Sequence, residues 1–249
     1  MIVLRSDDEI AAIRKAGAIV GRTLEVLKRH VKPGITTIEL DAIARDEILR
    51  RDGFPAFKNY KGFPGNICTS INEVVVHGIP SSRKLKTGDI ISLDAGVKFR
   101  DYYADGAATF AVGEVSTEAA RIISVTENAL YKGIEEAIPG NRLSDISHSI
   151  QQYVEENGFA VVRAFVGHGI GTKIHEEPEI ANFGPPGKGP RLEPGMVLAL
   201  EPMVNAGTFE VQVLDDGWTA VTRDRMISAH FEHTIAVRDG RAQIMTSPG

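Results

Sequence analysis

Two histidines in one glycine-rich segment are the clearest candidates in this sequence for residues that do chemistry. Residues 165–178 read FVGHGIGTKIHEEP, with His168 and His175 seven residues apart and a glycine on each side of the first. A neutral imidazole is a common metal ligand, and it also serves as a general acid or base near neutral pH. The segment alone therefore allows a metal site, a catalytic pair or two unrelated histidines, and partners elsewhere in the chain must decide.

A pair of aspartates in the first half of the chain marks a predicted hairpin. The strand IISLDAGV runs into KFRD and returns as YYADGAATFAV. A turn centred on residues 99–100 would place Asp94 directly opposite Asp105 in an antiparallel pair. Like charges opposite one another destabilise a sheet unless a cation compensates them.

A second pair of acids follows the same logic in the other half. The dipeptide Asp216-Gly217 is a strong signal for a tight hairpin turn. A register centred on this turn would place Glu201 opposite Glu232. Four carboxylates in apolar strands cannot all stay ionised without cations. Converging carboxylates form a hard-ligand site for divalent metals, and two such ions would neutralise the four charges.

The sequence also repeats itself, which predicts the architecture that holds these acids. LKTGDIISLDAGV at residues 85–97 is echoed by LEPGMVLALEPMV at residues 192–204. Apolar residues at three- and four-residue spacing predict two helices ahead of each strand, and Ser6 and Ser116 are the expected caps of the first helix in each pair. The predicted helices cover residues 7–30, 35–52, 117–137 and 141–157.

This repeat predicts an α+β fold built from duplicated helix–helix–strand units. The units, at about residues 1–112 and 113–249, would form a single catalytic domain. Their strands would lie side by side, with pseudo-twofold symmetry around a central antiparallel-rich sheet and helices outside it. The four acids would then meet near the symmetry axis.

The composition argues against several classes of partner. The 249 residues are 43% hydrophobic and carry a formal net charge of −5, which gives no electrostatic reason to bind nucleic acid or an anionic membrane. The single cysteine, Cys68, cannot form an internal disulfide. No apolar run is long enough for a signal peptide or a membrane span. We therefore expect a cytoplasmic protein.

Ordered motifs along the chain resemble the signature blocks of the type I methionine aminopeptidases of bacteria. They are NICTSINEVVVHGIP, SLDAGV, YYADGAATF, GHGIGTKIHEEP, ALEPMV, DGWTAVTRD and SAHFEHTI, and they run through most of the chain from about residue 55. The combination of GHGIG with HEEP, EPM and EHT is highly specific for that family. The resemblance implies the pita-bread fold and metal-dependent removal of the initiator methionine from nascent proteins and peptides.

The resemblance also implies which residues bind metal. By matched position, the five ligands would be Asp94, Asp105, His168, Glu201 and Glu232. Asp105 and Glu232 would bridge two divalent ions, which could be Co, Mn, Fe or Zn. Spacing alone allowed either histidine of the segment 165–178 to be a ligand, and the resemblance selects His168.

Catalytic roles are carried over from the family in the same way. His77, from VVVHGIP, and His175 would contact the substrate or the tetrahedral intermediate. Glu201 would carry a proton from the attacking water to the leaving amine. Two divalent ions would make that water a nucleophile at neutral pH.

The side chain of methionine needs an apolar, polarisable slot. The family pattern assigns its walls to Tyr60, Phe63, Cys68, Ile174 and Trp218. Phe63 and Ile174 depart from the tyrosine and phenylalanine of the familiar bacterial pattern, so the pocket wall is expected to differ there. Three further positions match a monovalent cation site of the family, namely Asn72, Val74 and Ser228.

The implied substrates are peptides and nascent polypeptides with an N-terminal methionine. The resemblance further implies transient association with the ribosome and a monomeric enzyme. Two alternatives stay open. Proline-specific aminopeptidases and creatinase-like hydrolases share the metal pattern or its scaffold, although they usually carry an extra N-terminal domain. A metal-free binding protein could keep the same shell, but such relatives lose ligands, and all five are present here.

Overall fold

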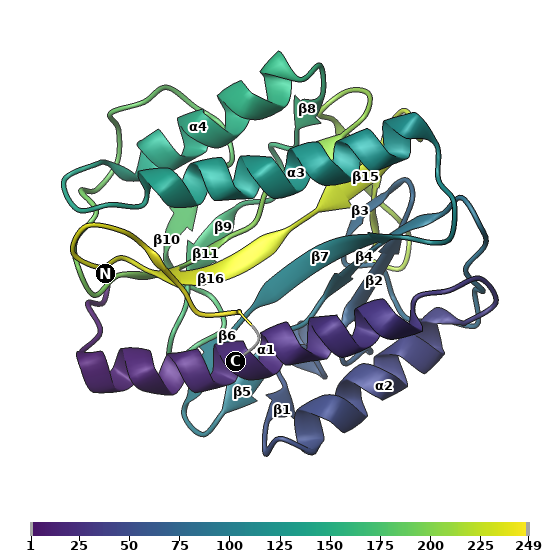
Figure 1. Cartoon of the computed structure of the whole chain (residues 1–249), viewed down its shortest axis with the longest axis horizontal. Coiled ribbons are helices and arrows are strands. Elements are labelled where there is room, and N and C mark those ends of the chain that lie inside the picture. The colour runs from purple at the N-terminus through teal and green to yellow at the C-terminus, as the bar shows by residue number, and fades with distance from the viewer. Residues whose placement is uncertain (1, 248–249) are drawn as a thin grey trace.

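A computed structural model describes residues 2–247 and places helices beside a central antiparallel sheet (Figure 1). The helices are α1 (Asp7–His30), α2 (Thr37–Leu49), α3 (Thr117–Glu136) and α4 (Leu143–Glu156), with a short 3₁₀ helix η1 (Tyr60–Gly62). All four predicted α-helices are confirmed, and the predicted α+β class with them. No helix within residues 2–247 combines the length and the apolar character that a membrane span requires.

Both predicted helix caps are present. Glu9 N donates to Ser6 Oγ at 3.3 Å, and Ser6 N donates to the Glu9 carboxylate at 2.9 Å. Ala119 N donates to Ser116 Oγ at 3.1 Å. Each cap satisfies an amide that has no partner inside its helix, which fixes where the helix begins.

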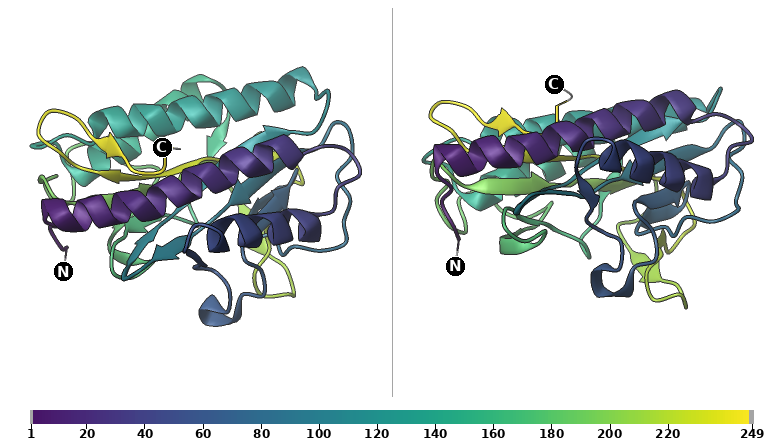
Figure 2. Two further views of the ribbon diagram at one scale, coloured as in Figure 1. Left: turned by 60° about the horizontal axis from the view of Figure 1, so that its bottom comes forward. Right: turned by 90° about the horizontal axis from the view of Figure 1, so that it is seen from below.

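Over residues 2–247, the strands form one large sheet and three small ones. The large sheet has eight strands in the order β10-β9-β11-β16-β7-β4-β2, with β17 paired to β16. The side views show α1 and α3 on one face of this sheet, while the segments around η1 and the β13–β14 hairpin extend from the other side (Figure 2). The strands are β1 (Phe54–Pro55), β2 (Cys68–Ile71), β3 (Val74–Val76), β4 (Ile90–Asp94), β5 (Val97–Phe99), β6 (Tyr102–Ala104), β7 (Gly106–Ala111), β8 (Ala160–Val161), β9 (Gly167–Gly169), β10 (Glu176–Ile180), β11 (Val197–Leu200), β12 (Met203–Asn205), β13 (Val211–Val213), β14 (Ala220–Thr222), β15 (Ser228–His230), β16 (Glu232–Ala236) and β17 (Gln243–Ile244).

Each helix pair covers its own apolar core. Residues of α1 and α2, such as Leu27 and Leu40, pack with Leu93 of β4. Residues of α3 and α4, such as Ile122 and Ile146, pack with strands of the second half of the chain, such as β11 and β16. A duplicated unit would give this arrangement, and the single domain with a repeat boundary near residue 112 stays a prediction.

The predicted register of the first hairpin was wrong by one residue at its turn. Phe99 pairs with Tyr102, so the turn lies at Arg100 and Asp101, where Arg100 has a left-handed φ of 54°. Asp94 consequently pairs with Ala107 and not with Asp105. The turn lies one residue later than predicted because Phe99 continues the strand and the polar dipeptide Arg100-Asp101 forms the turn.

The predicted register of the second hairpin is confirmed on both sides of its acids. Leu200 pairs with His233 and Met203 pairs with His230, which puts Glu201 opposite Glu232. The same register continues through β13 and β14 to the turn that contains Asp216. The Asp-Gly signal therefore fixed the pairing of strands far from the turn.

Candidate active site

The five predicted metal ligands come together on neighbouring strands of the large sheet. Asp94 ends β4, Asp105 directly precedes β7, Glu232 begins β16, Glu201 follows β11 and His168 is the middle residue of β9. These strands are adjacent in the order β9-β11-β16-β7-β4. All five residues are buried or nearly so, with Glu232 only 2% exposed.

The geometry of this cluster fits a metal ion. Asp105, His168 and Glu232 each offer a ligand atom, and these atoms lie within 4.8 Å of one another. His168 Nε2 lies 3.5 Å from Glu201 Oε1. Within residues 2–247, Asp94 Oδ1 and Glu232 Oε1 are buried and have no hydrogen-bond partner. Buried oxygen atoms of this kind are costly unless a cation satisfies them.

The electrostatics of the acids also favour a bound cation. Burial, together with repulsion from neighbouring acids, raises the pKa of Asp94, Glu201 and Glu232 well above their usual range. Burial raises the pKa of Asp105 to about 7. Burial lowers the pKa of His168, so its imidazole is neutral. A divalent cation reverses the cost of ionising the acids and accepts a neutral imidazole as a ligand.

The glycines around His168 are required by close strand packing. A Cβ atom on Gly169 would lie 2.1 Å from Glu177 O, and one on Gly167 would lie 2.4 Å from Ala199 O. Strand β9 therefore sits between β10 and β11 only without side chains at these positions. His168 Nδ1 lies 2.9 Å from Gly169 O, and donation to this carbonyl leaves the Nε2 lone pair facing the acids.

Gly169→Ala is expected to displace His168, because the new methyl group meets a backbone carbonyl that cannot rotate away. We expect a loss of about 2 kcal/mol in unfolding free energy and at least about tenfold weaker divalent-metal binding. Chemical denaturation and calorimetric titration measure the two effects.

Gly140→Ala is the matched control for this substitution. Gly140 lies in the turn between α3 and α4, with a φ of 96° and open space where a Cβ would stand. Its replacement should cost about 1 kcal/mol through backbone strain and leave metal affinity unchanged. Equal metal affinity in Gly169→Ala and the wild type would refute the packing argument.

A cavity of about 200 Å³ opens onto the acid cluster. Its lining includes all five predicted ligands and six further predicted residues, namely Tyr60, Phe63, Cys68, His77, His175 and Trp218. Ile174 packs in an apolar cluster with Phe63 and Cys68 but does not line the cavity. Phe57 and Lys61 line it and were not predicted, although they sit in the same segment as Tyr60 and Phe63.

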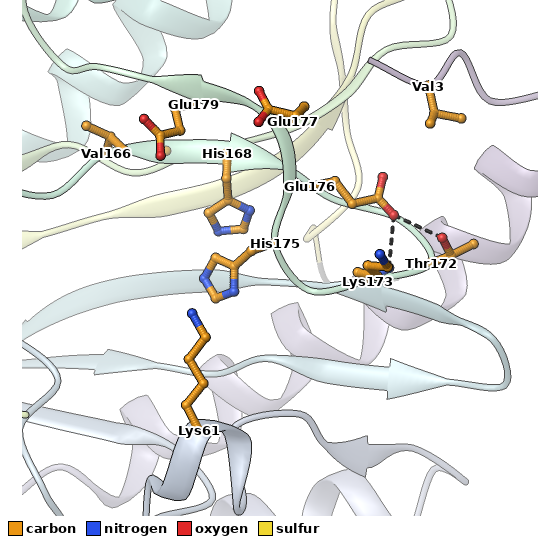
Figure 3. A pocket seen from close by; sticks show the side chains of 11 residues that line it. Val3, Lys61, Val166, His168, Thr172, Lys173, His175, Glu176, Glu177 and Glu179 are labelled. Atoms are coloured by element: carbon orange, nitrogen blue, oxygen red, sulfur yellow. Dashed lines mark hydrogen bonds between the residues drawn. The ribbon is translucent and has the colours of Figure 1, made fainter. Parts of the chain in front are cut away.

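His175 stands at the cavity beside His168. The two rings have centroids 4.3 Å apart, and Figure 3 shows them side by side with Lys61 pointing toward them. Tyr60 Oη lies 2.9 Å from His175 Nδ1. Burial, with help from His168, lowers the pKa of His175 to about 4, so the ring is neutral. If the Tyr60 hydroxyl donates to Nδ1, the ring proton is on Nε2 and is available to a ligand.

His77 and the aromatic residues form the rest of the wall. The His77 ring meets Phe165 and Trp218 edge to face, at centroid distances of 5.4 and 6.2 Å. His77 has a left-handed φ of 60°, a conformation that is strained for a side chain of its size. Phe63 packs edge to face on Trp218 at 5.2 Å. The cavity is thus acidic at its floor and aromatic at its walls.

The three residues of the predicted monovalent cation site lie near one another, and the polar groups of Asn72 and Ser228 form hydrogen bonds with other protein groups. Ser228 N donates to Asn72 O at 2.8 Å, and Ile90 N donates to Asn72 Oδ1 at 2.9 Å. Ser228 Oγ donates to Val204 O at 3.1 Å. Val74 is buried. Cation binding here stays a prediction.

Comparison with known proteins places this geometry in a family. The sequence profile of metallopeptidase family M24 matches residues 11–239. The chain is 54% identical over 246 residues to a methionine aminopeptidase of Clostridium perfringens and 54% identical over 246 residues to methionine aminopeptidase 1 of Bacillus subtilis. Each alignment covers 99% of both chains.

Solved structures agree with the sequence matches. A methionine aminopeptidase from Rickettsia prowazekii superposes with a TM-score of 0.97 at 43% identity, covering 99% of this chain and 100% of the other. One from Thermotoga maritima gives a TM-score of 0.98, also at 43% identity and with the same coverage. A prolidase from Pyrococcus furiosus shares the fold at a TM-score of 0.80, with 20% identity and 65% of its own chain covered. The predicted pita-bread fold is confirmed.

Proposed function

The chain belongs to metallopeptidase family M24, and on this premise we propose that it removes the N-terminal methionine from peptides and nascent proteins. It is a metallopeptidase, hence a hydrolase. The observation that carries the proposal is the 54% identity over 246 residues with proteins named methionine aminopeptidase. The proline-specific alternative has support only from distant fold neighbours, such as the prolidase at 20% identity.

The proposed metal ligands are the five residues predicted from the sequence, and they would hold two divalent ions. Support comes from the ligand atoms of Asp105, His168 and Glu232 within 4.8 Å of one another and from the buried, unpartnered oxygens of Asp94 and Glu232. Carboxylates with one imidazole suit Co, Mn, Fe or Zn. When bound, such ions supply a water of lowered pKa and an electrophile for the peptide carbonyl.

Protein groups around the reacting bond would move protons and hold the substrate. The Glu201 carboxylate, whose pKa is raised by burial and by Asp105, is suited to take a proton from water and return it to the leaving amine. The Nε2 proton of His175 would stabilise negative charge that develops on the carbonyl oxygen. His77 would contact the substrate from the wall that it forms with Trp218.

The methionine side chain would occupy the aromatic end of the cavity. Tyr60, Phe63 and Trp218 offer polarisable faces to a thioether. Cys68 is buried, and burial together with Asp94 raises the pKa of its thiol well above the usual value. Its thiol would therefore stay protonated and serve as a small apolar wall instead of a nucleophile.

Several finer features belong to the same proposal. Nascent chains at the ribosome would be the cellular substrates, and the enzyme would work in the cytoplasm as a monomer. Asn72, Val74 and Ser228 would hold a monovalent cation. The substrate contact proposed for Ile174 would be indirect, through the residues it packs against.

Release of free amino acid from short peptides tests the proposed function. The metal-loaded protein should release methionine from Met-Ala-Ser and leave Ala-Pro peptides intact, and a chelator should stop the reaction. Cleavage of the proline peptide alone would replace the proposal with the proline-specific alternative.

A further inference from the structure

A buried arginine ahead of α1 contacts the segment that joins the two active-site histidines. The Arg5 side chain is 6% exposed, and its Nη2 donates to Glu176 Oε2 at 2.5 Å, across 171 residues of sequence. Arg5 Nη1 donates to Glu9 Oε1 at 3.3 Å. The catalytic scheme above uses neither Arg5 nor Glu176, yet Glu176 directly follows His175. A buried ion pair at this place needs an explanation, because such pairs are costly to desolvate.

Glu176 ties this arginine to the turn before His175. Its Oε1 accepts hydrogen bonds from Lys173 N at 2.9 Å and Thr172 Oγ1 at 3.0 Å, as drawn in Figure 3. Its Oε2 accepts from Arg5. One carboxylate therefore fixes the start of the turn at residues 172–173 to its end at residue 176.

Close packing leaves the arginine no freedom to move. A Cβ atom on Gly171 would lie 2.4 Å from Arg5 Nη2, so the guanidinium rests against the backbone of the turn. Arg5 N donates to Gly195 O at 2.8 Å, which anchors the other end of the residue. Gly171 O accepts from Tyr103 N at 2.8 Å. The turn is thus held between the segment ahead of α1 and strand β6.

His175 depends on this turn more than His168 does. His168 lies inside β9, which pairs with both β10 and β11. His175 lies outside the strands, and within residues 2–247 its ring has one hydrogen bond, to Tyr60. Its direction is therefore set by this hydrogen bond and by the backbone that Glu176 holds.

We propose that Arg5, acting through Glu176, is a positioning residue that holds the turn of residues 170–176 so that the His175 imidazole faces the substrate. The inference rests on the proposed aminopeptidase function. Arginine is suited to this task because its planar fork reaches Glu9 and Glu176 at once, whereas lysine offers a single point of charge.

A double-mutant cycle with His175 separates positioning from general stabilisation. We expect Arg5→Ala to lower kcat for methionine release from Met-Ala-Ser by about 10- to 100-fold, because small misplacements of catalytic groups cost this much. KM should change by less than about threefold, because a positioning effect appears in the transition state. In a His175→Ala background, Arg5→Ala should lower kcat by less than about twofold, since the group it positions is already gone. Effects that multiply would overturn the proposal.

Two milder variants keep the test decisive if Arg5→Ala does not fold. Glu176→Gln keeps an oxygen for Lys173 and Thr172 but removes the charge that pairs with Arg5, so kcat should fall while the fold is retained. Arg5→Lys should recover part of the activity. Arg238→Ala is the matched control, because Arg238 forms an exposed ion pair with Asp7 at 2.6 Å near the same segment. Its kcat should stay within about twofold of the wild type.

A readout without turnover distinguishes failure of this inference from failure of the proposed function. Imidazole nitrogen NMR of the zinc-loaded full chain should show a shifted or broadened His175 signal in Arg5→Ala and Glu176→Gln, and an unchanged one in Arg238→Ala. An unchanged His175 signal in Arg5→Ala would overturn the proposal. A wild-type protein that released no methionine would contradict the proposed function, and the NMR comparison would still decide the role of Arg5.

Discussion

Asp105→Asn is expected to lower methionine release by about a thousandfold, because several kcal/mol of transition-state stabilisation depend on the metal ions it would bridge. Asp105 is 3% exposed, and its ligand atom lies within 4.8 Å of those of His168 and Glu232. Asparagine has the same shape and no charge. The variant should therefore keep the fold and lose metal affinity, which separates catalysis from stability.

Steady-state kinetics at saturating metal, with circular dichroism and thermal unfolding, measure both halves of this expectation. Asp101→Asn is the matched control, because Asp101 is exposed in the turn of the same hairpin. It should stay within about twofold of wild-type activity, as surface changes usually do. Near wild-type turnover in Asp105→Asn would contradict the bridging role. Loss of the fold in this variant would show that Asp105 is needed for folding.

The metal-free protein is expected to lose stability as the pH rises above 7, and divalent metal is expected to remove that loss. Burial raises the pKa of Asp105 to about 7. Burial and repulsion among the acids raise the pKa of Asp94, Glu201 and Glu232 well above their usual values. The folded chain then holds protons that the unfolded chain has already lost, so stability falls as pH rises through the folded pKa values. At about 1.4 kcal/mol per pKa unit, Asp105 alone would cost the metal-free fold on the order of 4 kcal/mol, and most of that cost builds up below pH 7. The further loss above pH 7 comes from Asp94, Glu201 and Glu232.

Measurements belong above pH 7 because buried histidines act in the opposite sense below it. Burial lowers the pKa of His175 and His233 to about 4 and that of His230 to about 3. Between these values and the unfolded pKa of 6.5, the unfolded chain binds the extra protons, and stability rises with pH. Above pH 7 the unfolded histidines are neutral, so the acids dominate.

Thermal unfolding at about pH 7 and about pH 8.5, with a chelator or with Mn²⁺, tests this expectation. The Tm of the metal-free protein should fall between the two values, and the increase in Tm from Mn²⁺ should grow, because metal binds the deprotonated carboxylates. A metal-free Tm that stays level or rises over this range would contradict the raised pKa values of the buried acids.

Local signals made most of the fold predictable. Ser6 and Ser116 mark helix starts through their own side chains, and the Asp216-Gly217 turn set a register that holds as far as Val197. The first hairpin lacked such a dipeptide, and its turn was placed one residue early. That error moved the pairing by two residues, and a shift of two keeps every side chain on its face of the sheet. Asp94 and Asp105 therefore still converge.

Contacts between distant segments could not be predicted in the same way. Arg5 and Glu176 are 171 residues apart, and neither periodicity nor turn chemistry links them. Phe57 and Lys61 reach the cavity because of the path of an irregular segment around η1. Ile174 was assigned to the cavity wall by the family pattern, but it packs into the apolar cluster with Phe57 and Phe63 and does not line the cavity. Tertiary packing decided these positions.

Calorimetric titration of the metal-free protein with Mn²⁺ tests most directly whether the five converging residues form a metal centre. We predict saturation near two ions per chain, with binding weakened at least about tenfold in Asp105→Asn and in His168→Ala and unchanged in Asp101→Asn. Saturation below one ion per chain, or wild-type affinity in both ligand variants, would contradict the metal centre and the hydrolytic function that depends on it.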